Sequence, residues 1–103
     1  MSQYKISIDT DALFDIQQAT DWYNEQLLEL GGRFQEQVKT QIDSLRINPA
    51  IYSIRYENVR CMLIKKFPFL VHFAINEKQY FVEVFAVFHT SRNPQIWWER
   101  KNQ

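Results

Sequence analysis

The spacing of apolar residues changes once along this chain, at Asn48-Pro49, and this change does most to limit the possible folds. Before it, apolar residues recur every three or four positions, which is typical of the buried stripe of an amphipathic helix. The first stripe contains Ala12, Ile16, Ala19, Tyr23, Leu27 and Leu30, and the second contains Phe34, Val38, Ile42 and Leu45. We expect Gly31-Gly32 to end the first helix and Asn48-Pro49 to end the second. The pattern predicts an antiparallel helical hairpin.

After Pro49 the apolar period becomes two, as in β-strands. The runs VRCMLIKKF, FLVHFAI and YFVEVFAVF predict three strands, and residues 76–79 suit a hairpin turn between the last two. KISI, at residues 5–8, predicts a further short strand before the helices. Strict alternation in the last run would place on one face Phe81, Glu83, Phe85, Val87 and His89.

This order of elements predicts an α+β fold. The N-terminal strand and the helical hairpin would pack on one face of a small antiparallel sheet, leaving the opposite face free to bind a partner. Asn93-Pro94 predicts a short C-terminal helix, because proline is favoured at the first helical position. A chain of 103 residues is long enough for one hydrophobic core, so a single domain is expected over residues 1–103.

The composition points to a cytoplasmic protein without contact to a membrane. The first nine residues lack the apolar core of a secretory signal, and no apolar run approaches the roughly 20 residues that span a bilayer. Cys61 is alone, which is compatible with a reducing compartment. The two histidines and the cysteine form no closely spaced ligand pair, so neither a metal site nor another cofactor is expected.

The charges are balanced overall but not along the chain. Residues 1–51 carry four basic and eight acidic side chains, whereas residues 52–103 carry eight basic and four acidic ones. Both sets are consistent with solvated faces. If the protein binds a polyanion, we expect the second half to do so.

The segment FHTSRNP, at residues 88–94, is a candidate anion site. His89 would stand at the end of the last strand with Arg92 close behind it, and a helix would begin at Pro94. The N–H groups at a helix start and a guanidinium both attract phosphate, and a histidine can exchange protons near neutral pH. A histidine at a strand end is also common as a purely structural residue.

The whole chain resembles the RelE/ParE superfamily of toxins from type II toxin-antitoxin systems, also known as plasmid stabilisation systems. The segments that carry the resemblance are DIQQATDWYNEQL, GGRF, SLRINPAIY, NVRCMLIKKFPFLVHFAI and VFHTSRNPQIWWER, in this order. It implies a bacterial toxin that a cognate antitoxin holds inactive. Two activities occur in the superfamily: ribosome-dependent cleavage of messenger RNA, and inhibition of DNA gyrase.

For RNA cleavage by an mRNA interferase, the resemblance implies a metal-independent endoribonuclease in which the RNA 2′-hydroxyl attacks the adjacent phosphate. The matching catalytic residues are His89 for proton transfer, with Arg92 and Arg60 on the phosphate. Residues expected to bind the RNA are Lys65, Lys66, Trp97 and Arg100. The expected partners are then the antitoxin, the ribosome and its mRNA.

Other interpretations stay open from the sequence. Many nuclease members have a catalytic tyrosine near the C-terminus, and residues 90–103 contain none, so a gyrase inhibitor without chemistry of its own is the alternative. A decayed toxin that only binds its antitoxin is another. The chain could act as a homodimer or within a toxin-antitoxin hetero-oligomer.

Several residues have structural interpretations. At least one of Trp97 and Trp98 is expected to pack into the core or an interface. His72 is expected to line a sheet face or to form a hydrogen-bonded pair. Asp15, with its neighbours Asp11 and Asp21, is expected on a solvated helix face. Glu83 is expected to pair with Arg60 or a lysine across the sheet.

Overall fold

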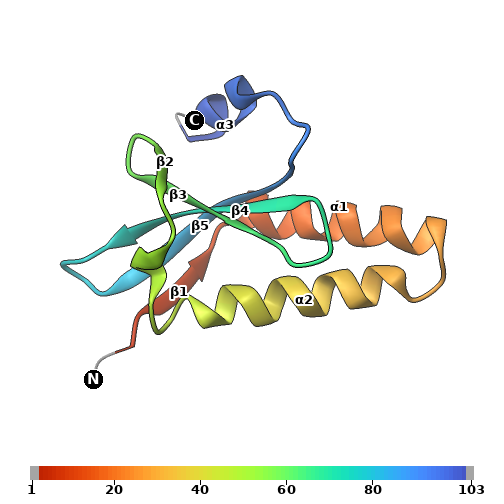
Figure 1. Cartoon of the computed structure of the whole chain (residues 1–103), viewed down its shortest axis with the longest axis horizontal. Helices are drawn as coiled ribbons and strands as arrows, with labels where there is room; N and C mark the ends of the chain where they lie inside the picture. The colour runs from red at the N-terminus through yellow and green to blue at the C-terminus, as the bar shows by residue number, and fades with distance from the viewer. Residues whose placement is uncertain (1–2, 102–103) are drawn as a thin grey trace.

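The computed structural model describes residues 3–101, which form a five-stranded sheet with helices on both faces (Figure 1). In chain order the elements are β1 (Lys5–Ile8), α1 (Thr10–Gln26), α2 (Leu30–Ser44), the short 3-10 helix η1 (Pro49–Ile51), β2 (Ile54–Tyr56), β3 (Val59–Leu63), β4 (Phe69–Asn76), β5 (Phe81–His89) and α3 (Pro94–Lys101). The predicted α+β architecture is confirmed.

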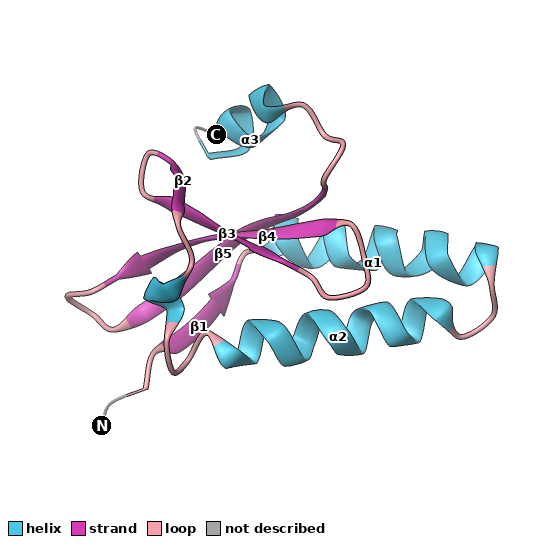
Figure 2. Cartoon of the chain, in the orientation of Figure 1, coloured by secondary structure: helices cyan, strands magenta, loops and turns pink. Residues whose placement is uncertain are grey.

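The strands lie in the order β1-β5-β4-β3-β2. The pairs β5-β4, β4-β3 and β3-β2 are antiparallel, whereas β1 runs parallel to β5 (Figure 2). The sheet is therefore mixed, and the prediction of a purely antiparallel sheet is wrong at β1. The helical hairpin leads from β1 to the opposite edge of the sheet, and strands β2 to β5 then return to β1, so no tight turn joins β1 to β5 and the two can pair in parallel. Strand β2 was not predicted, because three residues are too few to display a period.

The connection between α1 and α2 differs from the prediction. Helix α1 ends at Gln26, and Gly31 and Gly32 lie in the first turn of α2 rather than between the helices. Gly31 is required for close packing, since a Cβ atom there would lie 2.2 Å from the carbonyl oxygen of Thr20. Its N–H donates a 2.8 Å hydrogen bond to Oδ1 of Asn24. The glycine therefore fixes the approach of the two helices.

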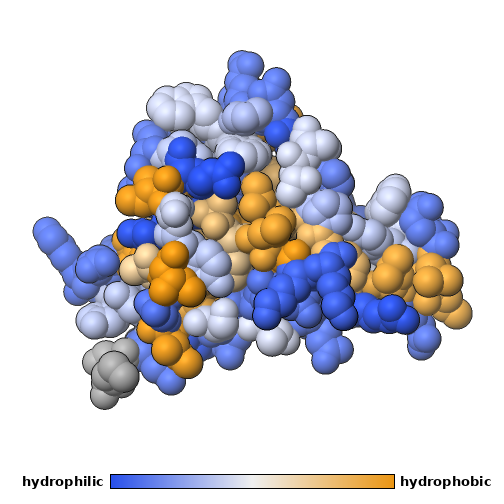
Figure 3. Space-filling view, in the orientation of Figure 1, coloured by the Kyte–Doolittle hydropathy of each residue, from blue (hydrophilic) through white to orange (hydrophobic). Residues whose placement is uncertain are grey.

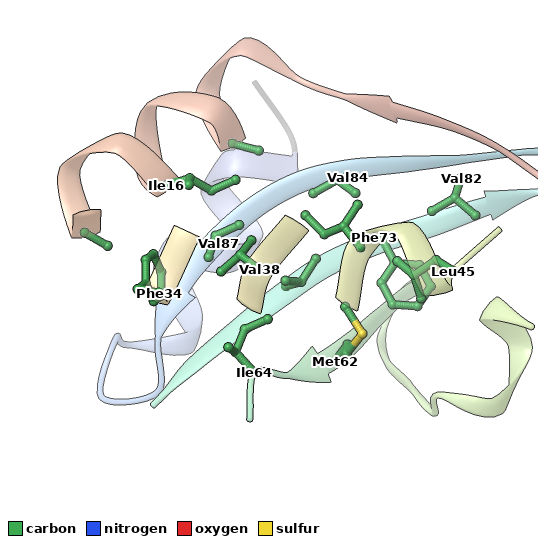
Figure 4. Close-up of a cluster of buried hydrophobic side chains, with 14 of the residues drawn as sticks. Ile16, Phe34, Val38, Leu45, Met62, Ile64, Phe73, Val82, Val84 and Val87 are labelled. Carbon is green, nitrogen blue, oxygen red and sulfur yellow. The ribbon is translucent and has the colours of Figure 1, made fainter. Parts of the chain in front are cut away.

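The main core lies between the helical hairpin and the sheet (Figure 4). It contains the predicted helix stripes and the facing strand residues, including Ile16, Phe34, Val38, Leu45, Met62, Ile64, Phe73, Val82, Val84 and Val87. Each fully buried side chain of this size contributes roughly 1.5–3 kcal/mol.

A β-bulge in β5 changes which residues face this core. His72 pairs with Ala86 but Phe73 pairs with Val84, so Phe85 has no partner in β4. The alternation therefore shifts by one residue at Phe85, and Val87 faces the core together with Val84. The predicted common face from Phe81 to His89 is wrong beyond this bulge.

The face of the sheet opposite the hairpin is not entirely free. Helix α3 packs on it and completes a second cluster, formed by Cys61, Leu70, Ala86, Phe88 and Trp97 (Figure 1). The expectation that at least one of the two tryptophans packs inside is confirmed by Trp97, which is 9% exposed. Binding at this part of the sheet would require α3 to leave.

Candidate functional site

The end of β5 brings together part of the predicted anion site. His89 is the last residue of β5 and pairs with Phe69, whose ring it meets edge-on with centroids 5.2 Å apart. The backbone N–H of Arg92 donates to the carbonyl oxygen of His89 over 3.0 Å, which closes a turn. His89 and Arg92 line a pocket of about 200 Å³ together with residues of α1. We refer to this pocket as the strand-end site.

The hydrogen bonds of His89 define its tautomer. The backbone N–H of Ser91 donates to Nδ1 of His89 over 3.0 Å, and the Ser91 hydroxyl oxygen lies 2.8 Å from the same nitrogen. A backbone N–H can only donate, so Nδ1 must be unprotonated and the proton of the neutral ring must be on Nε2. The lone pair of Nδ1 is then taken by the Ser91 N–H, and Nε2 is a hydrogen-bond donor.

Two predicted lysines lie at the same end of the sheet. Lys65 and Lys66 are exposed in the turn between β3 and β4, and this turn contacts the end of β5 through a 2.8 Å hydrogen bond from Thr90 N to the oxygen of Pro68. The guanidinium carbon of Arg92 lies 5.7 Å from the ring centroid of Phe88. This end of the sheet is therefore basic.

The cap of α3 follows the prediction. The Asn93 side-chain oxygen accepts a 2.9 Å hydrogen bond from the N–H of Gln95, and Pro94 is the first residue of the helix. The local sequence therefore determines where the chain turns back over the sheet after β5.

The structure does not bring Arg60 to the strand-end site. Arg60 pairs with Phe73 in β4, whereas His89 pairs with Phe69, so the two lie four residues apart along β4, about 13 Å at roughly 3.3 Å per residue. The Arg60 guanidinium donates to the carbonyl oxygens of Tyr52 and Ala50 over 2.6 and 3.3 Å. In this arrangement Arg60 ties the segment before β2 to the sheet.

Arg100 is also occupied within the protein. It forms a bidentate ion pair with Asp15, with N–O distances of 2.9 and 3.1 Å, and it donates to the carbonyl oxygen of Phe85 over 3.2 Å. Its guanidinium carbon lies 4.8 Å from the Phe88 ring centroid. The hydrogen bond to Asp15, more than any other contact, raises the pKa of Arg100. The prediction of an RNA-binding Arg100 does not fit this clamp.

Asp15 is not on a solvated face, and that prediction is wrong. Its side chain is 9% exposed, and its Oδ2 accepts a 3.0 Å hydrogen bond from the N–H of Val87. The signal was present in the sequence, because Asp15 lies three residues after Ala12 and four before Ala19, within the apolar stripe. A carboxylate at such a position needs a buried partner.

Trp97 covers a buried polar group on the other face of the sheet. His72 is fully buried, with its ring centroid 4.6 Å from that of Trp97, and its Nδ1 lies 3.2 Å from the Tyr56 hydroxyl and 3.4 Å from Cys61 Sγ. The expected hydrogen-bonded role of His72 is confirmed. Burial lowers the pKa of His72 to about 4, and burial raises the pKa of Cys61 to about 11. Both side chains are therefore neutral near pH 7, as core residues usually are.

A scan of known families identifies the protein family. The model of the ParE toxin of the type II toxin-antitoxin system parDE matches residues 6–94. The chain belongs to the ParE toxin family. This match covers β1 from its second residue, every element from α1 through β5 and the first residue of α3, and it agrees with the RelE/ParE resemblance seen in the sequence. No curated protein sequence matches the toxin.

Solved structures with a similar fold come from toxin-antitoxin systems. A chain of the chromosomal ParDE system of P. aeruginosa has a TM-score of 0.76 at 13% identity, and the match covers 86% of the toxin described here and 98% of that chain. A mutant E. coli RelE in the free state has a TM-score of 0.71 at 14% identity, with 99% and 97% covered. The intact E. coli RelBE toxin-antitoxin complex gives 0.66 at 17% identity, with 86% and 99% covered. At these identities the matches show a shared fold.

Other charged residues of the toxin lie away from the strand-end site. Glu83 lies on the face opposite Arg60, so the proposed pairing of these two is wrong. Glu83 lines a pocket with Lys101, and burial, followed by the neighbouring Asp9, raises its pKa. Within residues 3–101, no group of three potential metal ligands is close enough to hold an ion, and no helix is long and apolar enough to cross a membrane.

Proposed function

We propose that this chain is the toxin of a type II toxin-antitoxin module and that it arrests growth by binding a protein target, DNA gyrase, without catalysing a reaction. The ParE family match over residues 6–94 supports the first part. The hydrogen bond from Ser91 N–H to His89 Nδ1 supports the second, because it occupies the lone pair that a histidine needs as a base. A cognate antitoxin is the expected inhibitor, since related folds occur in toxin-antitoxin complexes.

The environments of the other nominated residues support the same proposal. Cleavage needs cations that surround the reacting phosphate. Arg60 and Arg100 instead bind groups of the protein itself, and the side chain of Trp97, on α3, is buried against the sheet. Of the predicted catalytic and RNA-binding residues, these three are engaged in holding the fold.

RNA cleavage is the second candidate, favoured by one observation. Arg92 lines the strand-end site with His89, and the neighbouring turn between β3 and β4 exposes Lys65 and Lys66, so a phosphodiester at this end of the sheet would find several cations. For this function the hydrogen bond from the Ser91 N–H to Nδ1 of His89 would have to break, so that Nδ1 could hold a proton while Nε2 accepted one from the RNA.

The variants His89→Asn and His89→Ala distinguish the two candidates. An asparagine side chain can still accept the Ser91 N–H, as in an Asx turn, but it cannot exchange protons. We therefore expect His89→Asn to arrest growth and to inhibit gyrase supercoiling like wild type. His89→Ala lacks the acceptor and should lose part of its thermal stability. Lys78→Gln, in the distant turn between β4 and β5, controls for a polar substitution away from the strand-end site.

Two assays read out these variants. Purified toxin is tested for inhibition of DNA supercoiling by gyrase, and in a translation reaction for new 5′ ends on the message. Supercoiling inhibition that survives in His89→Asn, without new 5′ ends, agrees with the proposal. Wild-type cleavage that disappears in His89→Asn would refute it and would establish the nuclease instead.

A further inference from the structure

The loop that joins α1 and α2 exposes large apolar side chains. Leu28 is 82% exposed, Leu27 is 58% exposed, and Trp22, in the last turns of α1, is 55% exposed. Figure 3 shows hydrophobic colouring at this end of the hairpin, which projects away from the sheet. Single exposed apolar residues are common on proteins, but three within seven positions indicate a contact surface. We call these three residues the hairpin tip.

The backbone of the loop holds these side chains outward. Leu27 has extended backbone angles, its N–H donates to Tyr23, and its carbonyl accepts from the N–H of Leu30, both over 3.0 Å. Glu29 adopts a left-handed conformation, with φ of 73°, which is unfavourable for a residue with a side chain. The 2.8 Å hydrogen bond from the Gly31 N–H to Oδ1 of Asn24 connects the end of α1 to the start of α2 across the same turn. The tip is thus preorganised, and little conformational entropy would be lost on binding.

The charges around the tip define the kind of partner. Residues 21–36 contain four carboxylates, Asp21, Glu25, Glu29 and Glu36, and a single cation, Arg33. This negative field repels nucleic acid and other polyanions. It attracts a surface on which basic side chains surround an apolar hollow.

We infer that the hairpin tip binds a basic protein surface on the target of the toxin, with Leu27, Leu28 and Trp22 in an apolar hollow and the neighbouring carboxylates facing Lys or Arg side chains. The inference rests on the proposed function only in taking the target to be a protein. It assigns the target contact to the hairpin, remote from the strand-end site on the sheet.

The test compares a double variant with a matched control. In Leu27→Gln/Leu28→Gln both changes are at exposed positions, so the fold should be unaffected. The control Ile47→Gln removes an apolar side chain that is 71% exposed in the turn after α2. We expect the double variant to bind purified gyrase at least tenfold more weakly and to lose growth arrest, while Ile47→Gln behaves as wild type. Glu25→Gln/Glu29→Gln should reduce the dependence of binding on salt.

Three further measurements can overturn the inference. It fails if the double variant arrests growth as wild type does. It also fails if that variant loses affinity for the antitoxin while its toxicity in cells without antitoxin is unchanged, because the tip would then be an antitoxin surface. A change in sedimentation between wild type and the double variant would identify a self-association surface instead. If wild type does not bind gyrase, the proposed function fails, and the growth-arrest comparison still decides whether the tip contacts the target.

Discussion

Removing the carboxylate of Asp15 should be among the most damaging single changes outside the apolar core. Strand β1 ends at Ile8, opposite Val84, so the edge of β5 beyond that point has no strand beside it. Asp15 from α1 accepts the N–H of Val87 there, and Arg100 from α3 donates to Phe85. The ion pair between Asp15 and Arg100 closes this edge and connects helices on the two faces of the sheet.

The size of the effect follows from burial. Loss of one partner of a buried ion pair destabilises the folded state by roughly 3–5 kcal/mol. We expect a value at the lower end here, because the Arg100 side chain is 21% exposed. Asp15→Ala also leaves the Val87 N–H without an acceptor, a penalty of about 1–3 kcal/mol that overlaps with the first. We expect a net loss of about 3 kcal/mol, which lowers the melting temperature by on the order of 10–20 °C.

Thermal unfolding of three variants tests this reasoning. Arg100→Met keeps an apolar contact to Phe88 and leaves the Val87 hydrogen bond in place, but it leaves the more buried Asp15 carboxylate without its cation, so it should be about as damaging as Asp15→Ala. Asp43→Ala is the matched control, because its 2.7 Å ion pair with Arg46 is exposed and should be worth less than about 1 kcal/mol. If Asp15→Ala lowers the melting temperature no more than Asp43→Ala does, the clamp is not structural and the reasoning is wrong.

Two further predictions concern stability. Gly31→Ala should lower the free energy of unfolding by about 2 kcal/mol or more, because its Cβ would clash with the Thr20 carbonyl. Gly32→Ala is the control, since a Cβ there has nothing within 4 Å, and it should be neutral or stabilising. Urea unfolding measures both. Since the folded-state pKa of His72 is lowered to about 4 from 6.5, the unfolded chain binds more protons between these values, and stability should fall by about 3 kcal/mol as the pH drops from 6.5 to 4. A His72→Phe variant, followed by unfolding at several pH values, should lose this part of the pH dependence, and an unchanged slope would contradict the assignment.

The sequence predicted those features that depend on local pattern. The helix stripes, the long strands and the start of α3 at Pro94 follow from periodicity and capping, which involve neighbouring residues only. The features it missed depend on contacts between distant segments. The bulge at Phe85 exists only in register with β4, and Gly31 serves a contact with Thr20 rather than a helix end.

The same distinction applies to the candidate site. His89 and Arg92 are neighbours in sequence, so their proximity was predictable. The positions of Arg60 and Arg100 were not, because a guanidinium binds whichever oxygen the fold brings to it: the carbonyl of Tyr52 in one case and the carboxylate of Asp15 in the other. Residue type predicted that these arginines bind oxygen atoms, but not that the oxygens belong to the protein itself.

The uneven charge distribution along the chain becomes a separation of surfaces in the folded toxin. The acidic first half forms the helical hairpin with its exposed tip, and the basic second half forms most of the sheet, including the turn with Lys65 and Lys66. A polyanion would approach the sheet end, whereas a basic protein would approach the hairpin. The two candidate functions therefore use different surfaces, so substitutions that neutralise one surface leave the other intact. Growth arrest that depends on Leu28 but not on His89 would support a protein-binding toxin, and the reverse dependence would support a nuclease.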